Sequence, residues 1–515
     1  MDTGMTTPTL ETVFKDLQDH AVVQASTELA KWTIPSVMIP LSTVRDGRRV
    51  PLERDYQSKG AVLVNSLASK MVQSLIPDHT PFFNIVPTDE VAKMVRTALS
   101  LDESQFNSQM IQYATMASEL AITGSSYSSY TILAQLLIIT GNALLYRDPV
   151  TKDTSVYSVR QFSVNRDGAG NVRRIILHER IQAQDIPDEL RNIHFSHKKP
   201  YDCEDLYTSI ELKKGEREYW EITQEIGSHP VGEPSTYPKH LCPYIVCTTR
   251  LNTGEHYGRG IVEDYAPEFA RLSELSTALQ DYEIESMRLL NLVPSRAGID
   301  ITELNTAQTG DYLQAEVDAI VAHEGGTSQK IQVIQAEIQN IFLELARAFM
   351  YNGQFRQGER VTAEEIRATI QETNIGHLAV FSHVSETFLK PLAFLLLHEV
   401  EPVLTTVLSE GGGSVSLQVG AKVVNKSVVT DRLLQAALVV QQVLPVLTQV
   451  TDRFNPDAVI EGIFQGFNLD ITQYVYTPEQ LQQIQQQKDA LAQEQAQQLQ
   501  GQQDPTLVAQ MTGSI

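Results

Sequence analysis

Cysteine is scarce in this chain of 515 residues: only Cys203, Cys242 and Cys247 occur, an odd number without CxxC spacing. Such a set supports neither a disulfide framework nor a structural zinc site, and it fits a reducing compartment. Positively charged residues are also few: the chain has 40 Lys and Arg residues against 63 Asp and Glu residues, which gives a formal net charge of −23. That balance argues against a protein that wraps tightly around nucleic acid, since such binding depends on cationic side chains.

Long apolar runs and a secretory signal are missing as well. The most apolar stretches, Ile132–Tyr146 and Pro391–Val400, are shorter than the roughly 20 residues that span a bilayer, so we expect both to be buried helices. Met1–Leu10 has no cationic region followed by an apolar one. We therefore expect no membrane segment and a protein that begins its life in the cytosol.

Motifs for phosphate or zinc chemistry are absent. No GxxxxGK(S/T) phosphate loop occurs. His398-Glu399 begins like the zinc motif HExxH, but the second histidine position is Pro402. We therefore expect no metal, no cofactor and no enzyme activity.

Two weaker patterns have ordinary explanations. The sequence GEHYGRG at 254–260 lacks the GxGxxG spacing of a dinucleotide loop, so a simple turn is the better interpretation. The carboxylate pairs Glu53 with Asp55 and Asp102 with Glu103 have polar surroundings, which are typical of solvated surface.

The N-terminal half mixes helices and strands. Apolar spacing predicts helices over Thr12–Trp32 and Gly60–Leu75 and then a strand at Phe82–Val86. A Gly-rich turn at 167–171 lies between apolar runs within Tyr157–Glu179 and predicts a β-hairpin, with short strands beyond it to Thr249. The length indicates several domains or one domain with large insertions, and the expected fold class is α+β, predominantly helical.

Two long helices joined by a cap are the most informative part of the chain. Glu263–Leu290 and Ser328–Met350 carry apolar residues at steps of three and four, which predicts one apolar stripe on each helix. Val293–Thr327 is too short for a domain and is expected to cap the pair. The second helix would be roughly 35 Å long at about 1.5 Å per residue, enough to line a tunnel in a ring of copies. A single copy would leave it underburied.

This region is acidic. From Ile261 to Met350 there are five Lys and Arg residues and fifteen Asp and Glu residues, a net charge of −10. A solvated helix face explains that charge and is favoured when the charge is taken alone; a tunnel that repels phosphate is the alternative. In the loop at 351–361, Arg356 and Arg360 would form a basic collar in a ring, although Glu359 offers either arginine a partner.

Helix returns after this loop. Thr362 is a good N-cap for a helix expected to run to about Leu408, with kinks at Gly376 and Pro391. A short strand pair over 415–429 and a helix over 431–450 are expected next. The end of the chain is Gln-rich and is expected to be helical and then disordered.

Six stretches of the chain are similar to one protein family. They are LASKMVQSLIP (67–77), TGNALLY (140–146), TYPKHLCPYI (236–245), HYGRGIVEDY (256–265), TAQTGDY (306–312) and GERVTAEEIR (358–367). Together they resemble the head-to-tail connector, or portal, proteins of podoviruses, the short-tailed phages. The likeness runs over most of the chain.

The resemblance implies a portal fold with wing, stem, clip and crown, assembled as a ring of about twelve copies around a central channel. The implied function is passage of double-stranded DNA into and out of the capsid at the portal vertex of the virion, after assembly in the host cytoplasm. Implied protein partners are the major capsid and scaffold proteins, the terminase, the tail adaptor and internal core proteins. The terminase, rather than the portal, hydrolyses ATP.

The resemblance also implies a division of the chain and a set of site residues. The parts are wing (1–260), stem helices (261–292 and 328–350), clip (293–327), tunnel loop (351–361), second wing part (362–429), crown (430–476) and tail (477–515). The DNA-contacting residues of the tunnel loop would be Gln354, Arg356 and Arg360. The partner-binding residues of the clip would be Pro294, Arg296, Asp311 and Tyr312.

Two functions of other classes fit the composition. One is a metal-dependent DNA-processing enzyme that uses clustered carboxylates. The other is a tail or scaffold component without a channel.

Overall fold

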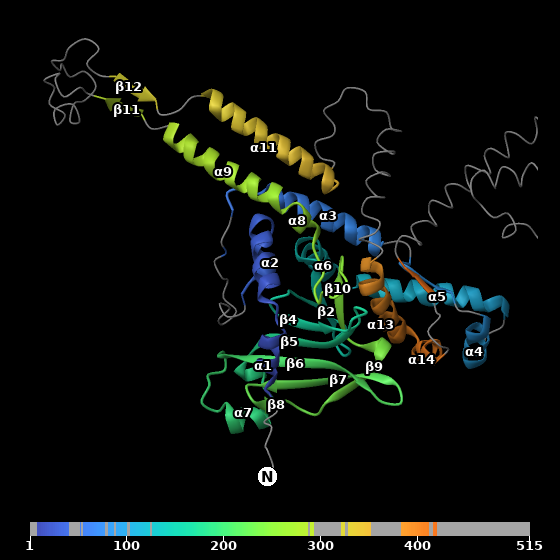
Figure 1. Ribbon diagram of the computed structural model, residues 1–515. Coiled ribbons are helices and arrows are strands. Elements are labelled where there is room, and N and C mark those ends of the chain that lie inside the picture. Colours follow the sequence, from blue (N-terminus) through green and yellow to red (C-terminus); the bar gives the residue numbers. More distant parts are fainter. Residues whose placement is uncertain are drawn as a thin grey trace, which may run out of the picture. The chain divides into compact units, whose positions relative to one another are not determined.

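The computed structural model describes residues 8–40, 52, 55–77, 81–86, 89–99, 103–123, 126–286, 289–292, 321–324, 328–351, 383–410 and 416–419 (Figure 1). The chain divides into two compact units, Met1–Val423 and Val424–Ile515, and all the described residues belong to the first. Helices and strands both contribute to this unit, so the α+β class is confirmed.

The first expected helix is two helices, α1 (Leu10–Leu17) and α2 (His20–Trp32), followed by a 3₁₀ turn, η1 (Pro35–Met38). The break occurs because Asp19 caps α2: its Oδ1 accepts hydrogen bonds from the backbone N–H groups of Ala21 and Val22, at 3.0 and 3.3 Å. Helix α1 packs separately, with Phe14 in a small apolar cluster on the larger sheet.

Four helices supply much of the core. They are α3 (Lys59–Leu75), as predicted, α4 (Asp89–Leu99), α5 (Glu103–Ile122) and α6 (Ser126–Thr140). From Leu136 to Thr140 every residue of α6 is buried, so this helix is apolar around its last turn and lies inside the core.

The larger sheet has six antiparallel strands in the order β4-β5-β6-β7-β8, with β9 paired to β7. Its strands are β4 (Phe162–Arg166), β5 (Val172–Gln182), β6 (Cys203–Lys214), β7 (Glu218–Ile226), β8 (His229–Pro230) and β9 (Ser235–Pro238). Between β5 and β6 lie η3 (Ala183–Asp185) and α7 (Asp188–His194). The η4 turn (Lys239–Leu241) follows β9.

The predicted hairpin is confirmed as β4–β5. Asp167 Oδ1 accepts hydrogen bonds from the N–H groups of Ala169 and Asn171, and Gly170 takes a φ of +86°, which favours glycine. The expectation of short strands is wrong for β6, which has 12 residues. Its register with β5 and β7 continues over most of its length, and this long-range pairing is not visible in a local pattern.

Two smaller groups of strands come from distant parts of the sequence. Strands β10 (Tyr244–Thr248), β2 (Asn142–Arg147) and β3 (Thr154–Tyr157) form one antiparallel sheet. The predicted strand near Phe82–Val86 is β1 (Phe83–Val86), and it pairs with β13 (Ser416–Val419). The remaining part of the strand pair expected over 415–429 lies outside the described residues.

Ile132–Tyr146 is a helix only as far as Thr140. The chain turns at Gly141, whose φ is +75°, and continues as strand β2. A Cβ at Gly141 would lie 2.3 Å from the carbonyl carbon of Arg259, so only glycine fits this crossing. The expectation of one buried helix is therefore wrong for 142–146.

The two predicted long helices are present with changed ends. The first is a short helix α8 (Ile261–Asp264) and then α9 (Ala266–Ser286), because Pro267 lacks the N–H that a continuous helix would need. Beyond it, β11 (Leu289–Leu292) pairs with β12 (Val321–Glu324), so the expected helical end at Leu290 is a strand. The second helix, α11 (Ser328–Ala348), agrees with the prediction.

The helix expected to reach Leu408 is interrupted. A π-helical turn, η6 (Ser385–Leu389), leads into α13 (Lys390–Val400), and Pro391 lies in the first turn of α13. Glu401 is extended because Pro402 restricts it, and α14 (Pro402–Glu410) follows. Residues 352–382, with the expected kink at Gly376, lie outside the described residues.

The cysteines agree with the sequence interpretation. All three are free, and Cys242 and Cys247 are buried. Burial raises the pKa of the Cys242 thiol to about 12, so it is unreactive near neutral pH. No helix in the described part of the chain combines the length and apolar character needed to cross a membrane.

A buried ion pair ties the small sheet to α13. Arg147, whose side chain is 3% exposed, donates from Nε and Nη2 to the two carboxylate oxygens of Glu399, at 2.8 and 3.0 Å. This is the glutamate that follows His398 in the incomplete zinc motif. The carboxylate of Glu399 makes a bidentate contact with the guanidinium group of Arg147, and this geometry fixes both side chains.

Removing one partner of this pair should be costly. We expect Glu399→Gln to lower the free energy of unfolding by roughly 3–5 kcal/mol, because it leaves the Arg147 charge buried without its carboxylate. Urea unfolding of the purified subunit measures the change. Glu11→Gln is the control, since it breaks the exposed pair with Lys15 and should cost less than about 0.5 kcal/mol. Equal losses in the two variants would contradict the assignment.

Candidate functional site

Helices α9 and α11 run side by side in opposite directions, with their base in the core (Figure 1). At the base, the ring of Phe349, just beyond α11, meets Phe269 of α9 edge-on at 5.6 Å and Tyr265 at 5.8 Å. Burial decreases toward the other end, where Ile284 is 52% exposed and Val333 is 69% exposed. One copy therefore leaves the far part of this helix pair underburied, as expected.

The surface of the helix pair is acidic. Described side chains of α8, α9 and α11 include eight carboxylates and two arginines. Arg271 pairs with Glu337 on the other helix, and Glu283 accepts a hydrogen bond from Gln335 at 3.5 Å. The exposed carboxylates are those of Asp264, Glu274, Asp281 and Glu344. In a single copy this surface fits both a solvated face and a wall that repels phosphate.

Two lysines of α3 contact the end of α11. The ammonium group of Lys59 lies 5.2 Å from the centre of the Phe342 ring. Lys70, three turns further along α3, donates a hydrogen bond to the carbonyl oxygen of Met350. Both contacts connect a core helix to the last turns of α11.

Asp55 has a different role from the one expected. Its Oδ1 accepts a hydrogen bond of 2.6 Å from the hydroxyl of Ser273 on α9, and its Oδ2 accepts one from Gln57. The interpretation of Asp55 as plain solvated surface is therefore wrong, because the carboxylate joins the segment before α3 to α9. The side chains of Glu53, Asp102 and Glu103 lie outside the described part.

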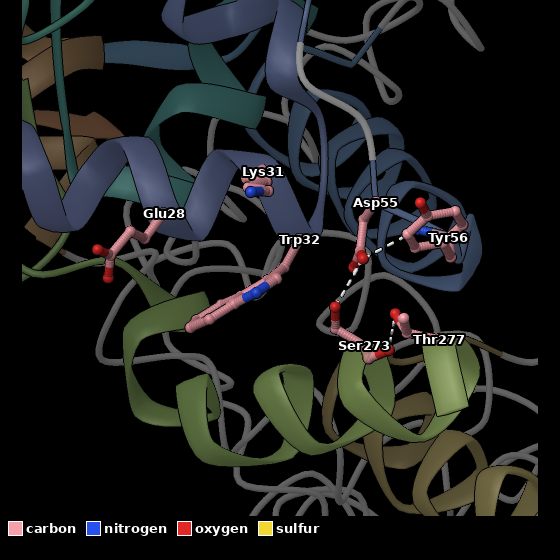
Figure 2. Close-up of a pocket in the computed structure, with 7 residues that line it drawn as sticks. All are labelled: Glu28, Lys31, Trp32, Asp55, Tyr56, Ser273 and Thr277. Atoms are coloured by element: carbon pink, nitrogen blue, oxygen red, sulfur yellow. Dashed lines mark hydrogen bonds between the residues drawn. The ribbon is translucent and has the colours of Figure 1, made fainter. Parts of the chain in front are cut away.

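An open polar pocket of about 570 Å³ adjoins this contact (Figure 2). Figure 2 shows its lining from α2, from the segment before α3 and from α9: Glu28, Lys31, Trp32, Asp55, Tyr56, Ser273 and Thr277. The lining holds carboxylates, an ammonium group, hydroxyls and an indole, but neither histidine nor cysteine.

The end of α11 is a tight C-terminal turn. The N–H of Tyr351 donates to the carbonyl of Ala346 at 2.7 Å, and the N–H of Met350 donates to that of Arg347 at 3.2 Å. These two bonds form a Schellman motif, in which one residue takes the left-handed conformation. That residue is Met350, with φ of +53°, where glycine is usual. Tyr351 is the first residue of the expected tunnel loop.

The GEHYGRG segment is a turn, as predicted, and it is packed tightly. The side-chain amide of buried Asn142 donates to the carbonyl of Gly258 at 2.7 Å and accepts from its N–H at 2.6 Å. A Cβ at Gly260 would lie 2.3 Å from the carbonyl oxygen of Ile139. The turn is thereby held against the junction of α6 and β2 immediately before α8 begins.

The same segment covers the outer edge of β4. The hydroxyl of Tyr257 accepts a hydrogen bond from the N–H of Val164 at 3.4 Å, and Nδ1 of His256 accepts one from the N–H of Arg166 at 3.1 Å. Edge strands with free N–H groups tend to pair with other chains, and side chains here occupy two of those groups. This turn thus covers the edge strand of the larger sheet and leads directly into α8.

A metal site finds no support in the described residues, where no group of three or more His, Cys, Asp or Glu side chains could hold an ion. Nδ1 of His398 contacts the hydroxyl of Thr405 at 2.9 Å, and its neighbour Glu399 binds Arg147. These side chains have structural partners.

The site residues implied by the family resemblance all lie outside the described residues: Gln354, Arg356, Arg360, Pro294, Arg296, Asp311 and Tyr312. In the sequence, described residues lie on either side of the expected clip and at the start of the expected tunnel loop. Strands β11 and β12 bring Leu292 and Val321 opposite each other, on either side of the expected clip segment. Tyr351 lies at the start of the tunnel loop.

Lys59, Lys70 and Asn142 were not singled out from the sequence, and the contact of Asp55 with α9 was not predicted. Lys59 and Lys70 are the charged residues of α3, and this is the signal that could have indicated them, because long cationic side chains beside an apolar stripe often reach a neighbouring helix. Nothing local distinguishes Asn142 from any other asparagine at a helix end.

The fold defines an α+β protein whose two 21-residue helices pair with each other beside a mixed core. Residues 7–470 match a family model described as bacteriophage head to tail connecting protein. The chain belongs to this family, the phage head-to-tail connector or portal proteins, as the resemblance indicated.

Its relatives include two portal proteins of phages. That of Pseudomonas phage phiKMV is 35% identical over 495 residues, covering 94% of this chain and 95% of that protein. That of Escherichia phage T7 is 28% identical over 411 residues, covering 78% and 75% respectively. A chain in the solved neck of an empty gene transfer agent particle aligns at 12% identity with a TM-score of 0.34, over 70% of this chain and 88% of that chain.

Asn142→Ala tests the contact that holds the turn before α8. It leaves the buried N–H and carbonyl of Gly258 without partners, so we expect a loss of roughly 2–4 kcal/mol in the free energy of unfolding. Denaturant unfolding measures it. Asn252→Ala, which removes an exposed contact with Glu255, should change the stability by less than about 0.5 kcal/mol. A change that small in Asn142→Ala would show that the turn is held by other contacts.

Proposed function

We propose that about twelve copies of this chain close into a ring, with a central channel through which double-stranded DNA enters and leaves the phage head. The observation that carries the proposal is the match to the connector family over residues 7–470. The exposed apolar residues Ile284 and Val333 on the far part of the helix pair fit it, because neighbouring copies would cover them in a ring.

In this ring, α9 and α11 are the stem helices, and 293–327 is the clip. Residues 1–260 and 362–429 form the wing, 351–361 the tunnel loop, 430–476 the crown and 477–515 the tail. The pairing of β11 with β12 supports a compact clip, since it closes the base of that segment. The clip residues Pro294, Arg296, Asp311 and Tyr312 bind the terminase during packaging and the tail adaptor afterwards.

The channel holds DNA weakly along most of its length. Carboxylates of the stem repel phosphate, and a collar of Arg356 and Arg360, with Gln354, contacts the duplex at one level. Weak contact suits a conduit, because DNA must slide through it in both directions.

The role of the protein is structural rather than catalytic. Glu399, the glutamate of the incomplete zinc motif, is bound to Arg147, which supports this assignment. The ring occupies the portal vertex of the virion after assembly in the host cytoplasm, in contact with the capsid, scaffold and internal core proteins. No described feature favours a DNA-processing enzyme as a second function.

The double variant Arg356→Ala with Arg360→Ala tests the collar. We expect rings of normal subunit number by electron cryomicroscopy and at least a severalfold loss of packaged or retained DNA, because two phosphate contacts per subunit disappear. Arg173→Ala, which removes a partly exposed arginine of β5 that pairs with Asp167, is the control and should package normally.

Two results would count against the proposal. Normal DNA yield and retention in the double variant would exclude the collar, and a monomer or an assembly without a channel would exclude the conduit. Mg²⁺-dependent cleavage of DNA by the purified protein, abolished by a single carboxylate substitution, would favour the enzyme instead.

A further inference from the structure

The last turn of α11 combines an unfavourable backbone conformation with an unusual partner. Met350 takes φ of +53°, and bulky side chains rarely adopt this region because Cβ approaches the backbone. Glycine would avoid that cost, but the Met350 side chain is only 8% exposed and fills core space that glycine would leave empty. The conformation therefore persists only if surrounding contacts hold it.

Lys70 makes such a contact. In the left-handed conformation, Met350 presents its carbonyl oxygen to α3, and Lys70 Nζ donates a hydrogen bond to it. A cation near a helix C-terminus is also favourable, since the last carbonyls carry partial negative charge. Burial lowers the pKa of Lys70, as expected for an ammonium group in the contact between two packed helices.

Two further contacts pack the end of α11. The rings of Phe342 and Tyr351 pack with centroids 6.0 Å apart, and the ammonium group of Lys59 lies over the Phe342 ring. Lys59 contacts a side chain of α11, whereas Lys70 donates to a backbone carbonyl of its C-terminal turn. The two lysines thus have different roles in one helix contact.

We propose that Lys70 is a positioning residue: by holding the carbonyl of Met350, it fixes the direction in which the chain leaves α11 after Tyr351. The effect on DNA rests on the proposed function, in which the segment after Tyr351 forms the collar of the channel.

Three variants of the full-length ring test this. Lys70→Met keeps the apolar part of the side chain and removes the hydrogen-bond donor, whereas Lys70→Arg keeps a cationic donor. Lys59→Met is the control at the other lysine of α3. We expect hydrogen–deuterium exchange at the amides of Met350 and Tyr351 to become about tenfold faster in Lys70→Met. It should stay near the original rate in Lys70→Arg and Lys59→Met.

DNA retention in virions assembled with each variant is the second measurement. We expect a severalfold loss in Lys70→Met and recovery in Lys70→Arg. Unchanged exchange in Lys70→Met, or equal acceleration in Lys59→Met, would overturn the positioning role whatever the DNA result. Faster exchange with normal DNA retention would overturn the link to the channel, and failure of the arginine collar itself would appear separately in the Arg356 and Arg360 variant.

Discussion

The two-sided contact between the Asn142 amide and the backbone of Gly258 is the constraint on which the arrangement of this subunit depends. It binds the start of β2 to the turn that precedes α8. Gly141, Gly258 and Gly260 lie at this contact, and a Cβ at any of them would clash with a neighbouring backbone. Because these glycines have no Cβ, helix α6, the small sheet and the start of the helix pair can meet at one junction. A larger residue at Gly141, Gly258 or Gly260 would separate these elements.

The helix pair is anchored firmly at one end and exposed at the other. At the base, Phe269, Leu272 and Phe349 are fully buried, and polar contacts from Asp55 and Lys70 fix the direction of the helices. Each buried aromatic or leucine side chain contributes roughly 1.5–3 kcal/mol, so the base dominates the stability of the pair. At the far end, Ile284 and Val333 are exposed, and in the proposed ring neighbouring copies would cover them.

Features that depend on local sequence were predictable. The Gly-rich turn at 167–171, helix α3 and helix α11 follow from turn chemistry and apolar spacing, which need no distant partner. The helix breaks at Asp19 and before Pro402 were not predicted, although both residues act locally, because the apolar spacing continues across each break. Strand β11 and the role of Asn142 depend on residues far away in the sequence, so a local pattern contains no signal for them. The spacing of charged residues on α3 could have indicated Lys70 but not its partner, the carbonyl of Met350.

Charge and apolar surface on the same helices act in opposite directions during assembly. Repeated around a ring, the exposed carboxylates of α9 and α11 repel one another, whereas covering Val333 and Ile284 is favourable. At about 0.15 M salt the screening length is about 8 Å, so repulsion between exposed charges on adjacent copies is weakened while apolar contact is not. In the proposed ring, salt should therefore favour closure and weaken the contact of DNA with the proposed arginine collar, because the first depends on apolar burial and the second on charge.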